Sequence, residues 1–466
     1  MASGKKAKTR ASRQRASAPH KKASRVSAAR SSGTRAEASA AGLRVRMFRV
    51  GFGDFFLLTV PSPAGEKHIL IDCGVHAKDL GTIRDAVSQM AQTCNNELAL
   101  VIVTHRHADH ISGFGTCRDI FNKITVERVW MSWFEDPTNK KAQAYQASLT
   151  ALAAQLGNSL AARGPGDESF LMTQNITGQM DAAGQSSNQT ALDVIHGGFK
   201  NKPQYDYYQA GDTPTLPQDL MDAGLSAQIL GPPIDASLVS QMTNKNQQYL
   251  GVLTTSQDGS IAPFAKQFKS EAHAYPHTAF EFYDAHRIKE LVDGSQPPVL
   301  AARAAAADKT LNNQSVVVLF SFGGKNLLFA GDAQWGNWEN FLYGGAYGTP
   351  GHMQLTVKAK SILSNIDFYK VGHHGSANAT PKDAVAALRD GCVGMCSTQP
   401  GAYNQVPRGP LMQALNKTMD NQLARSDQFA VDVDPPSKDS AASKDAGPVP
   451  SKFSHTAGTL YVDYDF

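Results

Sequence analysis

The chain of 466 residues has few cysteines and no long hydrophobic run. Its five cysteines form neither a C-x-x-C pair nor an even set, which argues against a disulfide scaffold or a zinc ribbon and favours a reducing compartment, the cytoplasm. No stretch approaches the roughly 18 apolar residues that cross a bilayer, so we expect a soluble protein without a membrane span. Nothing in the sequence specifies an oligomeric state.

Positive charge gathers at one end of the chain. Residues 1–42 hold eleven Lys or Arg and one acidic residue, which leaves 34 of the 45 basic and 40 of the 41 acidic residues, a net charge of −6, for the rest. Met1 and Val26 are the only large apolar residues of this segment, too few for a core. The pattern predicts a disordered basic tail that could bind nucleic acid or another polyanion, and an organellar address is the alternative to the cytoplasm.

Regular structure is expected from residue 43 onward, in an order of strands and helices typical of a layered α/β protein. Apolar runs and period-two alternation predict strands at 43–50, 55–60, 68–71, 98–103, 315–320, 326–330, 368–371 and 393–397. Helical spacing of apolar residues predicts helices at 79–96, 141–156 and 285–292. Between about 135 and 310 the pattern loosens, so we expect one domain, 43–466, with a long insertion between two β-rich halves.

Metal-ligating side chains concentrate directly after the predicted strand 98–103. His105, His107, Asp109 and His110 place three imidazoles and one carboxylate within six residues. At a strand end, the first two could turn toward one cation and the last two toward a second. Imidazole and carboxylate suit Zn, Mn or Fe. The alternative is a solvated histidine-rich loop, which is improbable because the chain has only 14 His in total.

Two later strand ends carry ligand-type residues as well. Asp332 follows the predicted strand 326–330, and a carboxylate there could bridge two cations, although Gly-Asp after a strand is also an everyday turn. His373 and His374 follow the predicted strand 368–371. Asp72, near the end of another strand, could orient a ligating histidine. Three strand ends that carry ligands are hard to explain as coincidence.

The order of these motifs resembles the metallo-β-lactamase fold, with H-x-H-x-D-H after an apolar strand, then G-D, then H-H-G-S. More narrowly, it resembles the hydrolase domain of the ComEC competence-protein family. The motifs that carry the narrower resemblance are V-G-F-G-D at 50–54, I-D-C-G at 71–74, N-N-Q-S at 312–315, A-G-D at 330–332 and H-H-G-S at 373–376. The resemblance extends over residues 43–466 but is weak in the middle.

This resemblance implies a four-layer αββα sandwich that holds one or two ions, Zn²⁺ or alternatively Mn²⁺. It implies that His105 and His107 bind the first ion, that Asp109 and His110 bind the second, and that Asp332 bridges them. We expect His373 to complete the second site, because it comes first off the strand. His374 is then a candidate general acid or substrate contact, and an ordinary surface histidine is the alternative.

The chain departs from the wider family at two points. Family members supply a third histidine to the first metal from the loop that here reads N-N-Q-S, a substitution that ComEC-like members share. An amide oxygen is a poorer zinc ligand, so the first site would bind loosely, prefer manganese, or borrow His196, His273 or His277. The membrane channel of competence proteins is also missing, so DNA uptake is not implied.

The expected function is that of a metal-dependent hydrolase of phosphodiester bonds, a nuclease or phosphodiesterase that uses metal-bound hydroxide. Asp109 would help to orient that hydroxide besides binding metal. One alternative is a hydrolase of a small ester, lactone or cyclic nucleotide, with the insertion forming a small pocket. The other is a non-catalytic, metal-stabilised module that binds nucleic acid through the tail.

Overall fold

The computed structural model describes residues 42–161, 167–177, 187–249, 310–429, 449–456 and 459–466. Nearly all of the predicted basic tail, the predicted helix at 285–292, and His273 and His277 lie outside these ranges. Among the helices of the described ranges, none combines the length and hydrophobicity that a bilayer crossing requires.

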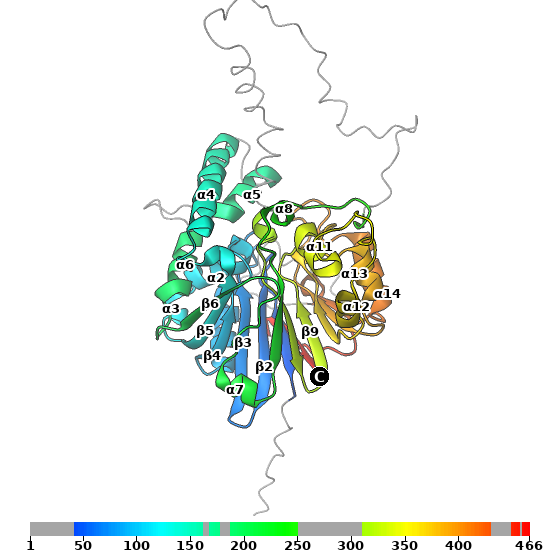
Figure 1. The fold of residues 1–466 in the computed structure, drawn as a ribbon. Helices are drawn as coiled ribbons and strands as arrows, with labels where there is room; N and C mark the ends of the chain where they lie inside the picture. Colours follow the sequence, from blue (N-terminus) through cyan, green and yellow to red (C-terminus); the bar gives the residue numbers. More distant parts are fainter. Residues whose placement is uncertain (1–41, 162–166, 178–186, 250–309, 430–448, 457–458) are drawn as a thin grey trace, which may run out of the picture. The chain divides into compact units, whose positions relative to one another are not determined.

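Two β-sheets form the centre of the described part of the chain (Figure 1). The first has the order β13 (Tyr461–Asp465), β1 (Arg44–Phe48), β2 (Phe55–Ser62), β3 (Gly65–Cys73), β4 (Glu97–Ile102), β5 (Thr125–Ser132) and β6 (Gln204–Tyr208). The second has the order β12 (Leu423–Arg425), β11 (Val393–Cys396), β10 (Phe368–Lys370), β9 (Lys325–Phe329), β8 (Val317–Phe322) and β7 (Ser226–Gly231).

Helices cover the outer face of each sheet (Figure 1). The first sheet is covered by α1 (Ile83–Thr93), α2 (Ala108–Thr116), α3 (Arg118–Phe121) and α6 (Ser187–Gly197). The second is covered by α11 (Trp335–Tyr343), α12 (Val357–Leu363), α13 (Lys382–Ala387) and α14 (Gly409–Thr418). The other α-helices of the described residues are α4 (Lys140–Leu160), α5 (Glu168–Thr177), α7 (Gln218–Asp222) and α8 (Ala236–Val239). Short 3₁₀ turns are η1 (Trp133–Glu135), η4 (His373–Gly375) and η5 (Ser426–Gln428).

Three apolar cores join these layers, and β4 shows how one strand serves two of them. Leu100 and Ile102 point into the core between the sheets, whereas Val101 and the following Val103 point into the core under α1, α2 and α6. A strand buried on both faces must be apolar throughout, which explains the continuous run in the sequence. The third core lies between the second sheet and its helices. The predicted αββα sandwich is therefore confirmed.

Local turn chemistry agrees with several predicted boundaries and corrects one. Gly323 and Gly324 both adopt positive φ in the hairpin between β8 and β9, the conformation that a two-residue turn requires, and this hairpin joins the predicted strands 315–320 and 326–330. The helix expected at 79–96 begins only at Ile83. Before it, Asp79 accepts a hydrogen bond from the backbone of Gly81, whose φ is +74°, so these residues form a turn.

The middle of the chain contributes to both sheets. Strand β6 pairs in parallel with β5, and β7 pairs antiparallel with β8. Helix α6 packs on α2 through the first outer core. The proposed boundaries of the insertion, about 135–310, stay a prediction, because residues 250–309 lie outside the described ranges.

One buried histidine predicts a pH dependence of stability. His68 lies on β3, 6% exposed, with its Nδ1 3.1 Å from Thr59 Oγ1 on β2. Burial, with the nearby charges of Arg46 and Lys67, lowers its pKa to about 4. The unfolded chain therefore takes up this proton more readily, so the contribution is complete above about pH 6.5 and is lost as the pH falls toward 4. We expect a loss of roughly 3 kcal/mol in the free energy of unfolding.

Urea unfolding at about pH 7 and pH 4.5 measures this effect. His68→Asn should flatten the difference between the two pH values, whereas His352→Gln, at an exposed position, should leave it unchanged. Equal pH dependence in wild type and His68→Asn would show that His68 does not carry it.

Candidate metal centre

The candidate site forms where strands of both sheets end. Strands β3 and β4 run in parallel in the first sheet, and β9 and β10 run in parallel in the second. The histidine-rich loop follows β4, Asp332 follows β9, and the His373-His374 pair follows β10. Parallel strands bring their carboxyl ends to one edge of a sheet, so these loops can meet.

Four buried side chains from three of these segments converge. His374 Nε2 lies 3.1 Å from Asp109 Oδ2 and 3.4 Å from Asp332 Oδ2, and His110 Nε2 lies 3.2 Å from Asp332 Oδ2. Each residue is at most 2% exposed. One ligand-type atom from each lies within 4.8 Å of those of the other three, so the group could hold a metal ion.

Close backbone packing positions Asp109 and His110 in the first turn of α2. A Cβ on Gly74 would lie 2.5 Å from the backbone carbon of Asp109, so only glycine allows this approach. The backbone N–H of Asp54 donates to the Asp109 carbonyl over 2.8 Å. The V-G-F-G-D and I-D-C-G motifs therefore hold the start of α2 in place.

Hydrogen bonds to Nδ1 fix how His110 and His374 present their rings. Asp72 Oδ2 lies 2.8 Å from His110 Nδ1, and the Asp72 carboxylate also accepts from the backbone and hydroxyl of Thr104. His374 Nδ1 lies 3.0 Å from the carbonyl oxygen of Ser397. With Nδ1 engaged, each ring directs Nε2 toward the carboxylates, the arrangement that orients a metal-ligating histidine. Asp72 therefore contacts a histidine of the candidate set, His110, and its role in orienting a metal ligand stays a prediction.

His105 and His107 lie beside this group but are arranged differently. His105 Nε2 is 2.9 Å from His107 Nδ1, and the His105 and His110 ring centroids are 4.2 Å apart. Ser315 Oγ lies 3.3 Å from His105 Nδ1 and accepts the backbone N–H of Asp332. Within the described ranges, His105 and His107 do not join a set of three ligand-type residues.

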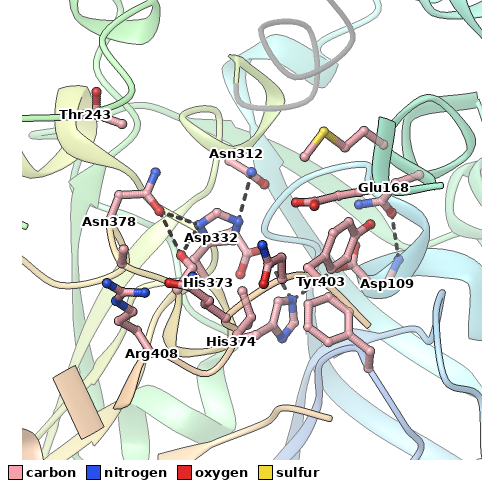
Figure 2. Close-up of a pocket in the computed structure, with 18 of the residues that line it drawn as sticks. Asp109, Glu168, Thr243, Asn312, Asp332, His373, His374, Asn378, Tyr403 and Arg408 are labelled. Atoms are coloured by element: carbon pink, nitrogen blue, oxygen red, sulfur yellow. Dashed lines mark hydrogen bonds and ion pairs between the residues drawn. The ribbon is translucent and has the colours of Figure 1, made fainter. Parts of the chain in front are cut away.

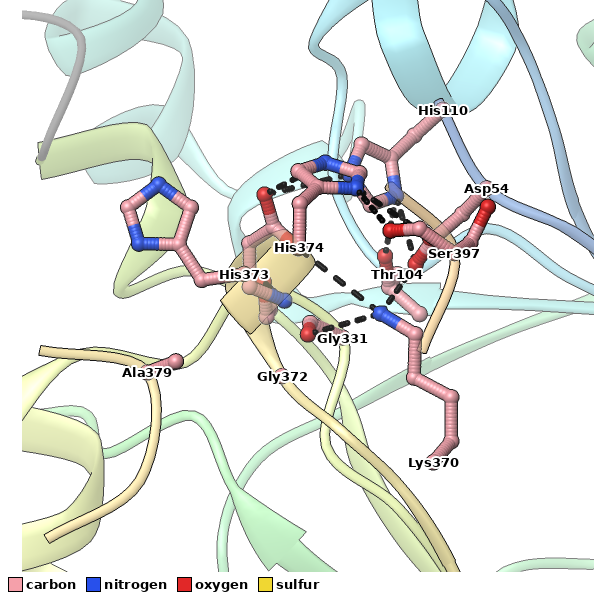
Figure 3. Close-up of polar contacts among 12 residues, drawn as sticks. Asp54, Thr104, His110, Gly331, Lys370, Gly372, His373, His374, Ala379 and Ser397 are labelled. Atoms are coloured by element: carbon pink, nitrogen blue, oxygen red, sulfur yellow. Dashed lines mark hydrogen bonds and ion pairs between the residues drawn. The ribbon is translucent and has the colours of Figure 1, made fainter. Parts of the chain in front are cut away.

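The structure separates His373 from His374. His373 lies in a polar cage, with its Nδ1 2.7 Å from Ser376 Oγ and 3.2 Å from Asn378 Oδ1, and its Nε2 3.3 Å from Asn312 Nδ2 (Figure 2). Both histidines have positive φ, 44° and 50°. This rarely occupied conformation turns the backbone so that the His373 ring points away from His110 (Figure 3). It is His374 that reaches Asp109 and Asp332.

The charges of the group favour an added cation. Burial lowers the pKa of His374, but the carboxylates of Asp332 and Asp54 and a hydrogen bond to Asp109 outweigh it and raise the pKa to about 10. The pKa of His110 is raised in the same way, because the carboxylates of Asp332 and Asp72 outweigh the effect of burial. Carboxylates that hold a proton on an imidazole would equally favour a metal ion in its place.

Burial leaves the other two histidines of the loop neutral. It lowers the pKa of His107 to about 4 and that of His105 well below its usual value. For His105 the neighbouring imidazoles add to the effect of burial. Neutral imidazole is the form that binds a metal.

Unsatisfied polar atoms show that the residues fit a cation. Oδ1 of Asp109 and Oδ1 of Asp332 are buried, and neither has a hydrogen-bond partner in the described part of the chain. Buried polar atoms are rarely left in this state, and a metal ion would satisfy them. The donor set of carboxylate and imidazole suits Zn, Mn or Fe.

A buried lysine that the sequence analysis missed borders this group. Lys370, the last residue of β10, is 2% exposed, and its ammonium contacts Asp54 and donates to the carbonyl of Gly331 over 3.1 Å (Figure 3). Its Nζ lies 3.8 Å from Asp332 Oδ1. Burial lowers its pKa, but Asp54 and Asp332 outweigh burial and raise it. A lysine inside an apolar strand was the signal that could have revealed it.

The candidates for replacing the third histidine of the first metal differ in their contacts. Asn313 donates to the carbonyls of Val239 and Gln241 and accepts the backbone N–H of Gln334, so its amide is already engaged. Asn312 Oδ1 is buried without a hydrogen-bond partner in the described ranges. His196 is exposed on α6, beside Tyr205. It is not among the residues that line the site.

A cavity of about 420 Å³ opens over the group. Asp109, Asp332 and His374 line it, as does His373 (Figure 2). Amide, hydroxyl and aromatic side chains form much of the remaining wall, and Arg408 is the only Lys or Arg among the described lining residues. The ligand-type atoms are therefore within reach of a small molecule.

Helices of the middle region also hold the site, which the sequence did not indicate. Asn175 on α5 accepts the backbone N–H of Asp109 over 3.3 Å. Asn188 on α6 donates to the carbonyls of Asn175 and Arg106. A lone Asn in a loosely patterned stretch carries no signal that could have identified either residue.

No family model matches the chain, and no curated protein matches it. Among solved structures, it is similar to YhfI from Bacillus subtilis, described as a metallo-β-lactamase fold protein, with 9% identity over 82% of this chain and 96% of that chain, at a TM-score of 0.32. It is also similar to a diphosphatase of the PhnP family, with 8% identity over 82% and 94%, at 0.32. A third is Zn²⁺-bound PqqB from Methylobacterium extorquens, with 10% identity over 81% and 86%, at 0.29.

Proposed function

We propose that the chain is a metal-dependent hydrolase of the metallo-β-lactamase type, acting on phosphodiester bonds. The observation that carries this proposal is the convergence of Asp109, His110, Asp332 and His374 within 4.8 Å, with every member except His110 lining a cavity of about 420 Å³. A ligand set that faces a cavity favours catalysis over a purely structural metal or a non-catalytic binding module. The narrower resemblance to ComEC hydrolase domains and the cytoplasmic location stay predictions.

These four residues would hold one cation, Zn²⁺ or Mn²⁺, and His105 with His107 and Asp332 would hold a second. His374 thus takes the ligand role that the sequence analysis gave to His373. A bound divalent cation lowers the pKa of a coordinated water and stabilises negative charge on a phosphoryl oxygen. Asp109 would help to hold the cation and to orient the attacking water.

His373 would contact the substrate and transfer a proton. Burial lowers its pKa, so the ring is neutral near pH 7. Ser376 donates to Asn378, which leaves Ser376 Oγ to accept the proton on His373 Nδ1. Asn312 Nδ2 donates to His373 Nε2. Nε2 is therefore the basic atom, and after taking a proton it can pass it to a leaving oxygen.

Arg408 would bind the anionic oxygen of the substrate. Its Nε donates to the Tyr249 carbonyl over 2.9 Å, and its backbone N–H donates to the Gly375 carbonyl over 2.7 Å. These bonds fix the guanidinium at the wall of the cavity. One guanidinium among the described lining residues suits a singly charged diester, whereas a nucleic-acid polymer normally contacts several Lys or Arg side chains. This favours a small phosphodiester, such as a cyclic nucleotide, over nucleic acid as the molecule that enters the cavity.

Turnover measurements test this function. With Mn²⁺ or Zn²⁺, the full chain should hydrolyse bis(4-nitrophenyl) phosphate, chelation should abolish the activity, and added metal should restore it. Asp109→Asn should lower the rate at least about 10²-fold, whereas Asp119→Asn, at an exposed ion pair, should not. A panel of cyclic nucleotides, DNA and RNA then identifies the substrate class. Undiminished turnover in Asp109→Asn, or after chelation, would refute the proposal.

The tail, residues 1–42, enters this proposal only as a polyanion-binding segment. If it binds nucleic acid, affinity should fall steeply with salt, by about 0.9 log units per log unit for each phosphate contacted on duplex DNA. Because all proposed ligands lie beyond residue 100, deleting the tail should leave hydrolysis of the small diester intact.

A further inference from the structure

A second cavity, of about 300 Å³, lies on the other side of the loop that precedes β8. Asn312 lines the catalytic cavity, whereas Gln314, two residues later, lines this one. The two cavities share no lining residue among those described. Helix α4, the 3₁₀ turn η1 and the segment from β7 to α8 supply the other walls. The proposed hydrolase site therefore does not account for it.

The floor of this cavity holds an unsatisfied amide. Gln314 is 1% exposed, and neither its Oε1 nor its Nε2 has a hydrogen-bond partner in the described part of the chain. Leaving both groups of a buried amide unpaired is costly, and native proteins rarely tolerate it without a ligand or water. A matching ligand must present a hydrogen-bond donor beside an acceptor.

The walls define the remaining chemistry. Trp133 and Tyr145 provide aromatic surface, and Val239 and Ile234 provide aliphatic surface. Tyr145 is 37% exposed and Ile234 is 55% exposed, so the cavity is open to solvent on this side. Aromatic side chains bind flat heterocyclic rings by stacking, whichever base the ring belongs to.

The mouth of the cavity carries one positive charge. Lys141, in the first turn of α4, is exposed and is the only charged residue among the described lining residues. An ammonium at the rim can bind an anionic group attached to a ring that lies deeper. The ligand should therefore present an uncharged group to Gln314 and an anionic group to Lys141.

We infer that this cavity binds a mononucleotide with an adenine base. Adenine presents the N6 donor beside the N7 acceptor, the pair that a glutamine amide recognises with two hydrogen bonds. The base would contact Gln314 and the aromatic walls, and the phosphate would reach Lys141. A volume of 300 Å³ is at the lower end for small-molecule pockets, which suits a base with its sugar. This site does not depend on the proposed hydrolase function.

Calorimetric titration of the full chain with adenosine 5′-monophosphate tests the inference. Gln314→Leu should weaken binding at least about tenfold, because it removes both hydrogen bonds to the base. Tyr145→Ala should weaken it by a similar factor through lost stacking. Ribose 5-phosphate, which keeps the charge but lacks the base, should bind at least about tenfold more weakly than the nucleotide. All variants keep residues 1–42, so any attraction of that segment for phosphate is the same throughout.

Matched controls locate the binding. Lys141→Ala should weaken binding severalfold, and Lys140→Ala, the neighbouring exposed lysine that does not line the cavity, should leave it unchanged. Arg408→Ala, in the catalytic cavity, should also leave it unchanged. Gln314→Leu should fold with unaltered or higher thermal stability, because an unpaired buried amide is removed. If it does not fold, Tyr145→Ala decides the test.

Three outcomes would overturn the inference. The first is that wild-type protein shows no binding of the nucleotide at millimolar concentration. The second is that Gln314→Leu, or the deciding Tyr145→Ala, retains wild-type affinity. The third is that Arg408→Ala abolishes binding, which would place the nucleotide in the catalytic cavity. The first two outcomes leave the proposed hydrolysis of the small diester untouched, whereas the third would identify the catalytic cavity as the nucleotide site.

Discussion

His374→Ala should lose most of its bound metal, and its turnover should fall at least about 10³-fold. His373→Ala should keep its metal and lose only turnover. The reason is geometric. His374 Nε2 is 3.1 Å from Asp109 and 3.4 Å from Asp332, but His373 contacts Ser376, Asn378 and Asn312 in a separate cage. Elemental analysis of the purified variants, together with diester turnover, separates the two roles.

An exposed histidine provides the control for this comparison. His352→Ala should retain both metal and activity, because His352 is exposed and does not line the cavity. Loss of metal from His373→Ala with retention in His374→Ala would restore the assignment made from sequence and contradict the one proposed from the contacts.

Lys370→Met should lower the free energy of unfolding by about 3 to 5 kcal/mol, the scale of removing one partner from a buried ion pair. Lys370 is 2% exposed and contacts Asp54, which is 1% exposed, and it also lies 3.8 Å from Asp332. The substitution would leave two buried carboxylates without this cation. Urea unfolding of metal-free protein measures the loss, since bound metal would compensate part of the charge.

Two further variants show whether the lost ion pair is the cause. Lys325→Met removes an exposed lysine that lies 3.6 Å from Asp367 and should cost less than about 1 kcal/mol. Lys370→Met combined with Asp54→Leu should recover part of the loss, because the uncompensated carboxylate is removed as well. A Lys370→Met cost no larger than that of Lys325→Met would show that the buried pair contributes little.

The periodicity of the sequence was sufficient to predict the layers, because each layer repeats one simple rule. A strand such as 98–103 is apolar throughout because both of its faces are covered, and the Gly323-Gly324 turn follows from backbone sterics alone. The ligand-type residues could be found for the same local reason, since they stand directly after predicted strands. Whether they bind metal stays a prediction.

The choice between His373 and His374 depends on information that the sequence order does not contain. Order along the chain favoured the first histidine, whereas in the folded chain His374 contacts Asp109 and Asp332, and both histidines have positive φ, a conformation that no sequence pattern here indicates. The contributions of Asn175 and Asn188 to the site could not be predicted from the sequence either. Each acts through one or two hydrogen bonds to a segment about 65 to 80 residues away, and no periodic pattern records such a contact.

The pairing of β1 with β13 has a consequence for how the polypeptide can be made. Arg46 near one end of the domain donates to both oxygens of Asp463 over 2.8 Å, and its guanidinium stacks over Tyr461. During synthesis from the N-terminus, β1 and Arg46 are therefore made before their partners, β13 and Asp463, which lie more than 400 residues later in the chain. The ribosome must therefore produce the chain through β13 before the free edge of β1 can pair, so the first sheet closes late in the folding of the domain.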